Sequence, residues 1–146
     1  MGNFVAKTKR EVNTSAIDFF TIGHLVMGYI AWIVSAIIIF FTPLDDSITL
    51  STADKCLAIA CAIVIGIAWE YIENFIFINT KRFASVKFEG REDSLANSLT
   101  DIVGVIGGGA IAWWFSYLPP VVFALISVDL ILGLLVLMKK LEKMTK

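Results

Sequence analysis

Four stretches of the chain are long and apolar enough to cross a lipid bilayer, and they constrain the fold more than any other feature. They span about residues 17–41, 56–78, 95–118 and 121–138. A membrane-spanning helix needs about 20 such residues. Because the bilayer interior offers no hydrogen-bond partners to the backbone, stretches of this kind form helices. The sequence therefore predicts an all-α, polytopic membrane protein, in which residues 1–146 form one transmembrane domain, a four-transmembrane-helix bundle.

Composition supports this prediction and excludes other classes of protein. Of the 146 residues, 58% are apolar, and the mean hydropathy is +0.81. A soluble domain of this size could not hide that much apolar surface from water. The net charge of −1 gives no basic face for nucleic acid. Cys56 and Cys61, five residues apart, do not have the spacing of a metal or redox motif.

The distribution of basic residues predicts the orientation of the bundle. Of the twelve Lys and Arg residues, only Lys55 falls between the first two helices, and none falls between the last two. The others lie before the first helix, between the second and third, and after the fourth, at positions 7–10, 81–91 and 139–146. Because cytoplasmic loops carry an excess of Lys and Arg, we expect both ends in the cytoplasm (N-in/C-in). The expected location is the inner (plasma) membrane, as a multi-pass protein.

Several polar side chains lie within the spans, where ionisable groups cost about 2.5–3.5 kcal/mol each on insertion scales. At 1.5 Å per residue, these groups reach similar depths, about 6–16 Å from the cytoplasmic end of each helix. Three different helices therefore bring polar groups to one layer. The residues that we expect in it are His24 from the first helix, Glu70 and Glu73 from the second, and Asn97 and Asp101 from the third.

The spacing within the helices agrees with a shared layer. Glu70 and Glu73 are three residues apart and so lie on one helix face. Beyond Asp101, the third helix continues with Gly104, Gly107, Gly108 and Gly109, and glycines allow a neighbouring helix to approach closely. Asp18 precedes His24 by six residues, which turns it about 120° away, so we expect only His24 to face the layer. Asp129 either pairs across the bundle or makes a separate contact.

Carboxylate, imidazole and amide groups suit a divalent cation such as Mg²⁺, Mn²⁺, Zn²⁺ or Fe²⁺. The predicted ligands are His24, Glu70, Glu73, Asn97 and Asp101, and the predicted catalytic residues are Glu73, His24 and Asp101. Carboxylates close together in a low dielectric need a cation or a shared proton to coexist. The alternative is that these groups hydrogen-bond one another and only fix the register of the helices.

Three motifs carry a resemblance to a known family. They are His24-x-x-x-Gly28, Trp69-Glu70-x-x-Glu73, and the segment from Asp93 through Asn97 and Asp101 to Gly104. Together they resemble the small VanZ-like and YjdF-like inner-membrane proteins, over roughly residues 18–108. The resemblance implies a link to envelope lipids or to glycopeptide tolerance, without a settled reaction.

Three functions remain open on the sequence. The first is a membrane enzyme in which a divalent cation acts on a lipid or a lipid-phosphate head. The second is an accessory subunit of a larger membrane complex, or a homodimer formed through the glycine stripe. The third is a small cation or proton transporter. The outer halves of the helices argue against it, because they hold few polar groups besides Ser35 and Asp129.

Overall fold

The computed structural model describes residues 4–6, 11–12, 15–41, 50–77 and 94–144, and these are helical apart from short connections. The elements are α1 (Phe19–Phe41), α2 (Thr52–Tyr71), a π-helix η1 (Ile72–Phe77), α3 (Leu95–Phe115) and α4 (Pro120–Met144). Four helices, the second formed by α2 together with the start of η1, are long and apolar enough to span a membrane. The predicted fold class is therefore confirmed. The basic loop expected at positions 81–91 lies outside the described residues.

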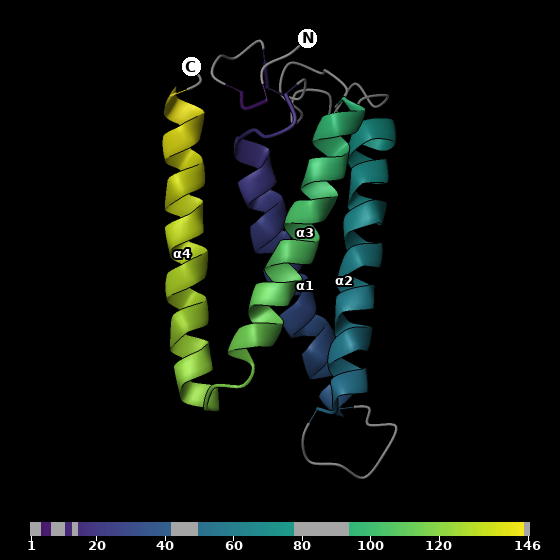
Figure 1. The fold of residues 1–146 in the computed structure, drawn as a ribbon, viewed down its shortest axis with the longest axis vertical. Helices are drawn as coiled ribbons and strands as arrows, with labels where there is room; N and C mark the ends of the chain where they lie inside the picture. Colours follow the sequence, from purple (N-terminus) through teal and green to yellow (C-terminus); the bar gives the residue numbers. More distant parts are fainter. Residues whose placement is uncertain (1–3, 7–10, 13–14, 42–49, 78–93, 145–146) are drawn as a thin grey trace.

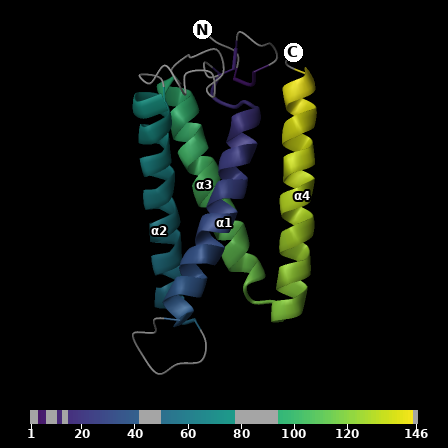
Figure 2. The same ribbon diagram turned by 180° about the vertical axis from the view of Figure 1, so that it is seen from behind.

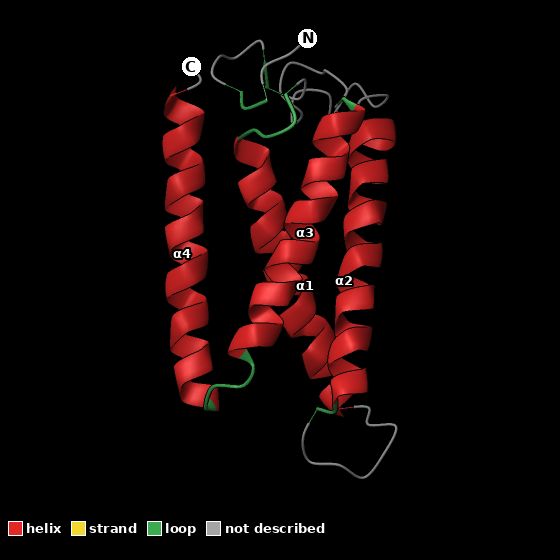
Figure 3. Ribbon diagram, viewed as in Figure 1, coloured by secondary structure: helices red, strands yellow, loops and turns green. Residues whose placement is uncertain are grey.

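The helices form a three-helix core with a fourth helix at its side (Figure 1). Helices α1 and α3 cross each other in the middle of the bundle, and α2 packs against both of them. Seen from behind, α4 again stands apart and lies nearest to α1 (Figure 2). The start of α1, the start of α3 and the end of α4 lie at one end of the bundle, which we call the terminal end (Figure 3). This arrangement is compatible with the predicted N-in/C-in topology, which stays a prediction.

Glycine residues allow α1 and α3 to cross in backbone contact. A Cβ atom on Gly28 would collide with the Val105 carbonyl, and one on Gly108 would collide with the Leu25 carbonyl. The close approach expected from the glycine stripe therefore occurs within the chain, between α1 and α3. Gly107 takes no part, because a Cβ there would meet no atom within 4 Å.

Beyond this crossing, toward the opposite end of the bundle, lies the apolar core. Its buried members are Tyr29, Trp32, Ala36, Ala58 and Ala112. The Tyr29 hydroxyl hydrogen-bonds the Ser127 hydroxyl at 2.7 Å, and Ser127 is the one buried residue of α4, a helix that the structure describes throughout. A single buried polar contact thus helps to hold α4 against α1.

Helix boundaries differ from the expected ones by a few residues, for local reasons. Helix α1 begins at Phe19 because the Asp18 carboxylate accepts a hydrogen bond from the Phe20 amide at 2.8 Å and so caps the helix. Helix α2 begins at a capping box formed by Ser51 and Asp54, ahead of the apolar stretch itself. Helix α4 continues to Met144, because Lys, Leu and Glu favour the helical conformation after the apolar span ends.

Candidate metal centre

Three helices bring one histidine and two carboxylates together inside the bundle. The His24 Nε2 atom lies 3.0 Å from Glu70 Oε1, and His24 Nδ1 lies 3.6 Å from Asp101 Oδ2. All three residues are buried, with 6%, 6% and 1% of their surfaces exposed for His24, Glu70 and Asp101. They come from α1, α2 and α3, in the half of the bundle nearer the terminal end. These three predicted site residues therefore do meet.

The geometry of α1 determines which imidazole nitrogen is available. His24 Nδ1 lies 3.0 Å from the carbonyl oxygen of Phe20, one turn earlier in the same helix. A neutral imidazole that donates its Nδ1 proton to this carbonyl leaves a lone pair on Nε2. Metal-binding histidines commonly donate their other ring N–H to a backbone carbonyl in this way. The Nε2 atom, which faces Glu70, is therefore the nitrogen that can bind an ion.

Polar atoms of the cluster are left without hydrogen bonds. In the described part of the chain, His24 Nε2, Glu70 Oε1 and Asp101 Oδ1 are buried and have no hydrogen-bond partner. The 3.0 Å contact between His24 Nε2 and Glu70 Oε1 is thus within hydrogen-bond distance but is not aligned as a hydrogen bond. Buried polar atoms almost always find a hydrogen-bond partner, so three atoms without one in the same place mark a candidate binding site.

The spacing of the donors suits one ion. One ligand atom from each of His24, Glu70 and Asp101 can be chosen so that all three lie within 4.8 Å of one another. Nitrogen and oxygen ligands sit about 2.0–2.2 Å from an ion such as zinc, so two ligands lie at most about twice that distance apart. The limit of 4.8 Å is slightly above this separation, so the three side chains would have to move closer together to share one ion.

Glu73 and Asn74 lie at the edge of this cluster, on the π-helix η1. Glu73 Oε2 is 3.9 Å from His24 Nε2, and its side chain is 16% exposed, twice the fraction of Glu70. The Asn74 amide donates to Glu70 Oε2 at 3.1 Å and contacts the Ser98 hydroxyl of α3 at 3.4 Å. Asn74 therefore orients the second oxygen of Glu70. The sequence spacing placed Glu70 and Glu73 on one face but did not predict the π-helix, a feature frequent at functional sites.

The other polar residues of the spans have different surroundings. Asn97 is buried, and its amide lies 3.5 Å from the Ala16 carbonyl, which links α3 to the segment before α1. Its predicted role as a metal ligand stays a prediction. Asp18 caps α1, a role that was not predicted, although an Asp just before an apolar helix is a common cap. Asp129 lies on the exposed side of α4 and is not part of the cluster.

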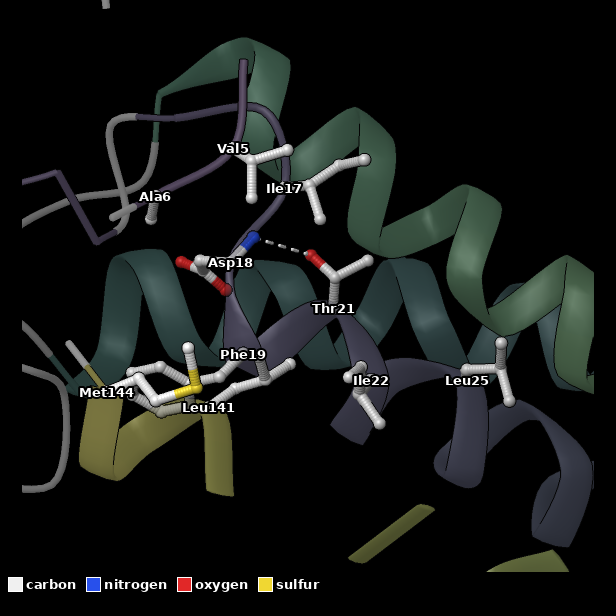
Figure 4. Close-up of a pocket in the computed structure, with 10 residues that line it drawn as sticks. All are labelled: Val5, Ala6, Ile17, Asp18, Phe19, Thr21, Ile22, Leu25, Leu141 and Met144. Carbon is white, nitrogen blue, oxygen red and sulfur yellow. Dashed lines mark hydrogen bonds between the residues drawn. The ribbon is translucent and has the colours of Figure 1, made fainter. Parts of the chain in front are cut away.

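An apolar cavity of about 360 Å³ lies beside the cluster, between the N-terminal segment, α1 and the end of α4 (Figure 4). Its walls include Val5, Ile22 and Leu141, and its few polar lining residues include Asp18 and Thr21. Thr21 also lies next to the Asp101 carboxyl group. Thr21 therefore separates the cavity from the cluster, and the cavity's volume lies within the range of small-molecule sites.

Comparison with known proteins yields one match. Residues 3–142 match the model of a family described as "Protein of unknown function (DUF2585)". No curated protein and no solved structure matches the chain. The expected membership of the VanZ-like or YjdF-like proteins was therefore wrong, because the matching family model covers nearly the whole chain and is neither of these. The short motifs in the apolar helices resemble those proteins but do not show membership of their families.

Proposed function

We propose that this chain, which belongs to the DUF2585 family of uncharacterised proteins, is a membrane enzyme that uses a divalent cation to hydrolyse a phosphate ester in the head of a membrane lipid. His24, Glu70 and Asp101 would hold the ion, and Glu73 would act beside it. The observation that carries the proposal is the set of three buried polar atoms that converge from three helices and have no hydrogen-bond partner.

The charges of the cluster support a cation. Three carboxyl groups, those of Glu70, Glu73 and Asp101, surround one imidazole. Even a protonated imidazole would not balance three carboxylates. A divalent cation lowers the cost of keeping these carboxylates charged in a low-dielectric interior. Its preferred ligands are oxygen atoms and imidazole nitrogen, which are the groups present.

A bound ion in this place would favour phosphate chemistry. It would polarise a phosphoryl oxygen and would lower the proton affinity of a bound water molecule. Glu73, the most exposed carboxylate of the group, can take a proton from that water as it attacks phosphorus. The phosphorus–oxygen bond to the lipid alcohol would then break, and the proton would pass from Glu73 to the leaving alkoxide, so that one water would be consumed.

Position supports a lipid as the substrate. The cluster lies in the half of the bundle nearer the terminal end, where the predicted cytoplasmic head-group region lies. The apolar cavity next to it, lined by Ile22, Leu25 and Leu141, offers room for part of an acyl chain. With Thr21 between cavity and cluster, a lipid seated there would carry its head near the ion. The proposed location is the cytoplasmic leaflet of the plasma membrane.

The first test is metal binding by the purified protein. After purification in detergent and equilibration with Mg²⁺, Mn²⁺, Zn²⁺ or Fe²⁺ followed by desalting, we expect stoichiometric metal in the wild type. Glu70→Gln keeps the size of the side chain but removes a charged ligand. We expect it to weaken binding by more than the roughly 10- to 100-fold that loss of a second-shell partner costs.

Glu142→Gln, the same change on α4 outside the cluster, is the matched control and should bind metal as the wild type does. Mass spectrometry of metal content and calorimetric titration both report the result. Absence of stoichiometric metal from the wild type with all four ions would reject the metal centre.

A second candidate function is proton transfer, favoured by one specific observation. The two nitrogens of His24 face carboxylates on opposite sides, Glu70 and Asp101, as a proton-carrying imidazole would require. A path across the membrane would also need polar groups toward the other end of the bundle. The nearest buried ones are Tyr29 and Ser127, which hydrogen-bond each other. Metal-free protein that acidifies vesicles in response to a proton gradient would favour this candidate.

A further inference from the structure

Helix α4 exposes a regular row of side chains on the side opposite its packing face. The row is spaced three and four residues apart in alternation and consists of Val122, Leu125, Asp129, Leu132 and Val136; we call it the α4 seam. Leu125 is 64% exposed and Val136 is 67% exposed. At 100° per residue, the centre of the seam lies about 180° around the helix from the buried Ser127. An alternating three-and-four spacing is the pattern by which two helices pack as a left-handed coiled coil.

Asp129 makes this seam unusual for a surface that faces lipid. It follows Pro120, the first residue of α4, by nine positions, which is about 14 Å along the helix axis. The carboxyl group thus lies deep in the span and on its exposed side. Ionisable side chains at such depth are rarely exposed to lipid, because they pair with one another or face a polar interior. We therefore expect the exposed Asp129 to pair with a polar group from outside the chain.

We propose that the α4 seam is the interface between two copies of this chain, paired through parallel α4 helices around a two-fold axis along the membrane normal. Two copies of a membrane protein share one orientation, so such an axis places every residue opposite its own counterpart at equal depth. Asp129 then meets Asp129 of the second copy. One protonated carboxyl group donates a hydrogen bond to the other carboxylate, as carboxyl pairs that share a site do.

Two further features fit a second copy. Gly133 lies one turn beyond Asp129, and a Cβ there would meet no atom within 4 Å. This leaves room for a neighbouring backbone to approach next to the carboxyl pair. Within the described helices, lysines lie only near the helix ends, at positions 55, 139, 140 and 143. At the depth of Asp129 the α4 seam of a second copy therefore offers one polar side chain, Asp129 itself. The proposal does not depend on the metal centre.

Disulfide crosslinking at two adjacent positions tests the interface. In a Cys56→Ser, Cys61→Ser background, Val136→Cys places a thiol on the seam. Leu137→Cys places one at nearly the same depth but 100° around the helix, and it is also exposed. We expect mild oxidation in native membranes to convert Val136→Cys into a species of twice the chain mass and to leave Leu137→Cys monomeric. Equal crosslinking at the two positions would overturn the proposal, as would a Val136→Cys product that joins a different protein.

Subunit counting by single-molecule photobleaching in lipid vesicles provides the second measurement. We expect the wild type and Asp129→Asn, which keeps a hydrogen-bonding amide, to be dimers. Asp129→Leu should weaken dimerisation by about 3- to 20-fold, the range of interhelical polar contacts in membranes. Gly133→Leu should separate the copies by steric hindrance. A wild type that is monomeric at every vesicle density, or an Asp129→Leu variant that dimerises as strongly as the wild type, would overturn the proposal.

Discussion

His24 is the residue on which the candidate centre depends, because its two ring nitrogens have different surroundings. Nδ1 lies within hydrogen-bond distance of the Phe20 carbonyl, while Nε2 faces Glu70 and, farther away, Glu73. The helix itself therefore fixes the orientation of the ring. Glu70 is oriented from the other side by the Asn74 amide, so two of the three donors are held in place by neighbours that do not touch the proposed ion.

Glu73→Gln separates catalysis from metal binding at the level of one residue. Glu73 is more exposed than Glu70 and farther from His24 Nε2, so it is assigned to proton transfer. We expect Glu73→Gln to retain metal and to lose activity by about 10²- to 10⁴-fold, the usual contribution of a general base. Glu70→Gln should lose both.

The activity is measured as phosphate released from phosphatidic acid in mixed micelles, with metal content determined on the same samples. Glu142→Gln again serves as the control. If Glu73→Gln lost its metal together with its activity, Glu73 would be a ligand, and its assignment as the base would be wrong.

At the level of helices, the α1–α3 crossing holds His24 and Asp101 in place. Gly28 and Gly108 lie where a side chain would collide with the backbone of the other helix. Gly104 continues this contact toward the cluster, since a Cβ there would lie 3.1 Å from the Thr21 carbonyl. The crossing therefore determines the separation between the helix that carries the imidazole and the helix that carries the Asp101 carboxylate.

Two adjacent glycines of α3 provide a matched test of this crossing. Gly108→Ala should destabilise the protein by about 1–3 kcal/mol, the usual cost of overpacking, and should also weaken metal binding. Gly107→Ala adds the same methyl group where no atom lies within 4 Å. It should be neutral or slightly stabilising, because alanine favours a helix more than glycine does. Thermal unfolding in detergent measures both, and equal melting temperatures would show that α1 and α3 do not cross at Gly108.

Sequence reasoning predicted the four helices and the residues of the cluster better than it predicted their boundaries and partners. Hydrophobic length and the depth of His24, Glu70 and Asp101 depend only on position along a helix, so they could be read from the chain. The π-helix at Ile72–Phe77 and the contact between Asn74 and Ser98 depend on packing between helices. The cap at Asp18 was not predicted, because the apolar stretch begins at Ile17, one residue before it.

Over the whole molecule, the polar cluster and the apolar core lie at different heights of the bundle. The cluster of His24, Glu70 and Asp101 lies toward the terminal end, and the apolar core with Tyr29 and Trp32 lies farther from it. At the opposite end, the Lys55 ammonium lies 3.9 Å from the centre of the Tyr117 ring. Lys55 is the basic residue that the positive-inside rule predicts to lie on the outer side. It packs on an aromatic side chain of a kind common at membrane interfaces.

The native cysteines allow the predicted orientation to be tested without new reporter domains. Cys56 is exposed and lies in the first turns of α2, at the end of the bundle opposite the terminal end. Cys61 lies five residues, or about 7.5 Å, deeper along the helix. With both termini in the cytoplasm, a membrane-impermeant maleimide added to intact spheroplasts should label the wild type and Cys61→Ser but not Cys56→Ser.

A thiol at the terminal end should behave in the opposite way. Lys143→Cys, in a Cys56→Ser, Cys61→Ser background, lies in the last turn of α4 and should be labelled only after the membrane is permeabilised. The twelve Lys and Arg residues give this expectation its physical reason, since all but Lys55 would otherwise have to lie on the outer side. Labelling of this Lys143→Cys variant in intact spheroplasts would reverse the topology and would move the candidate metal centre to the outer leaflet.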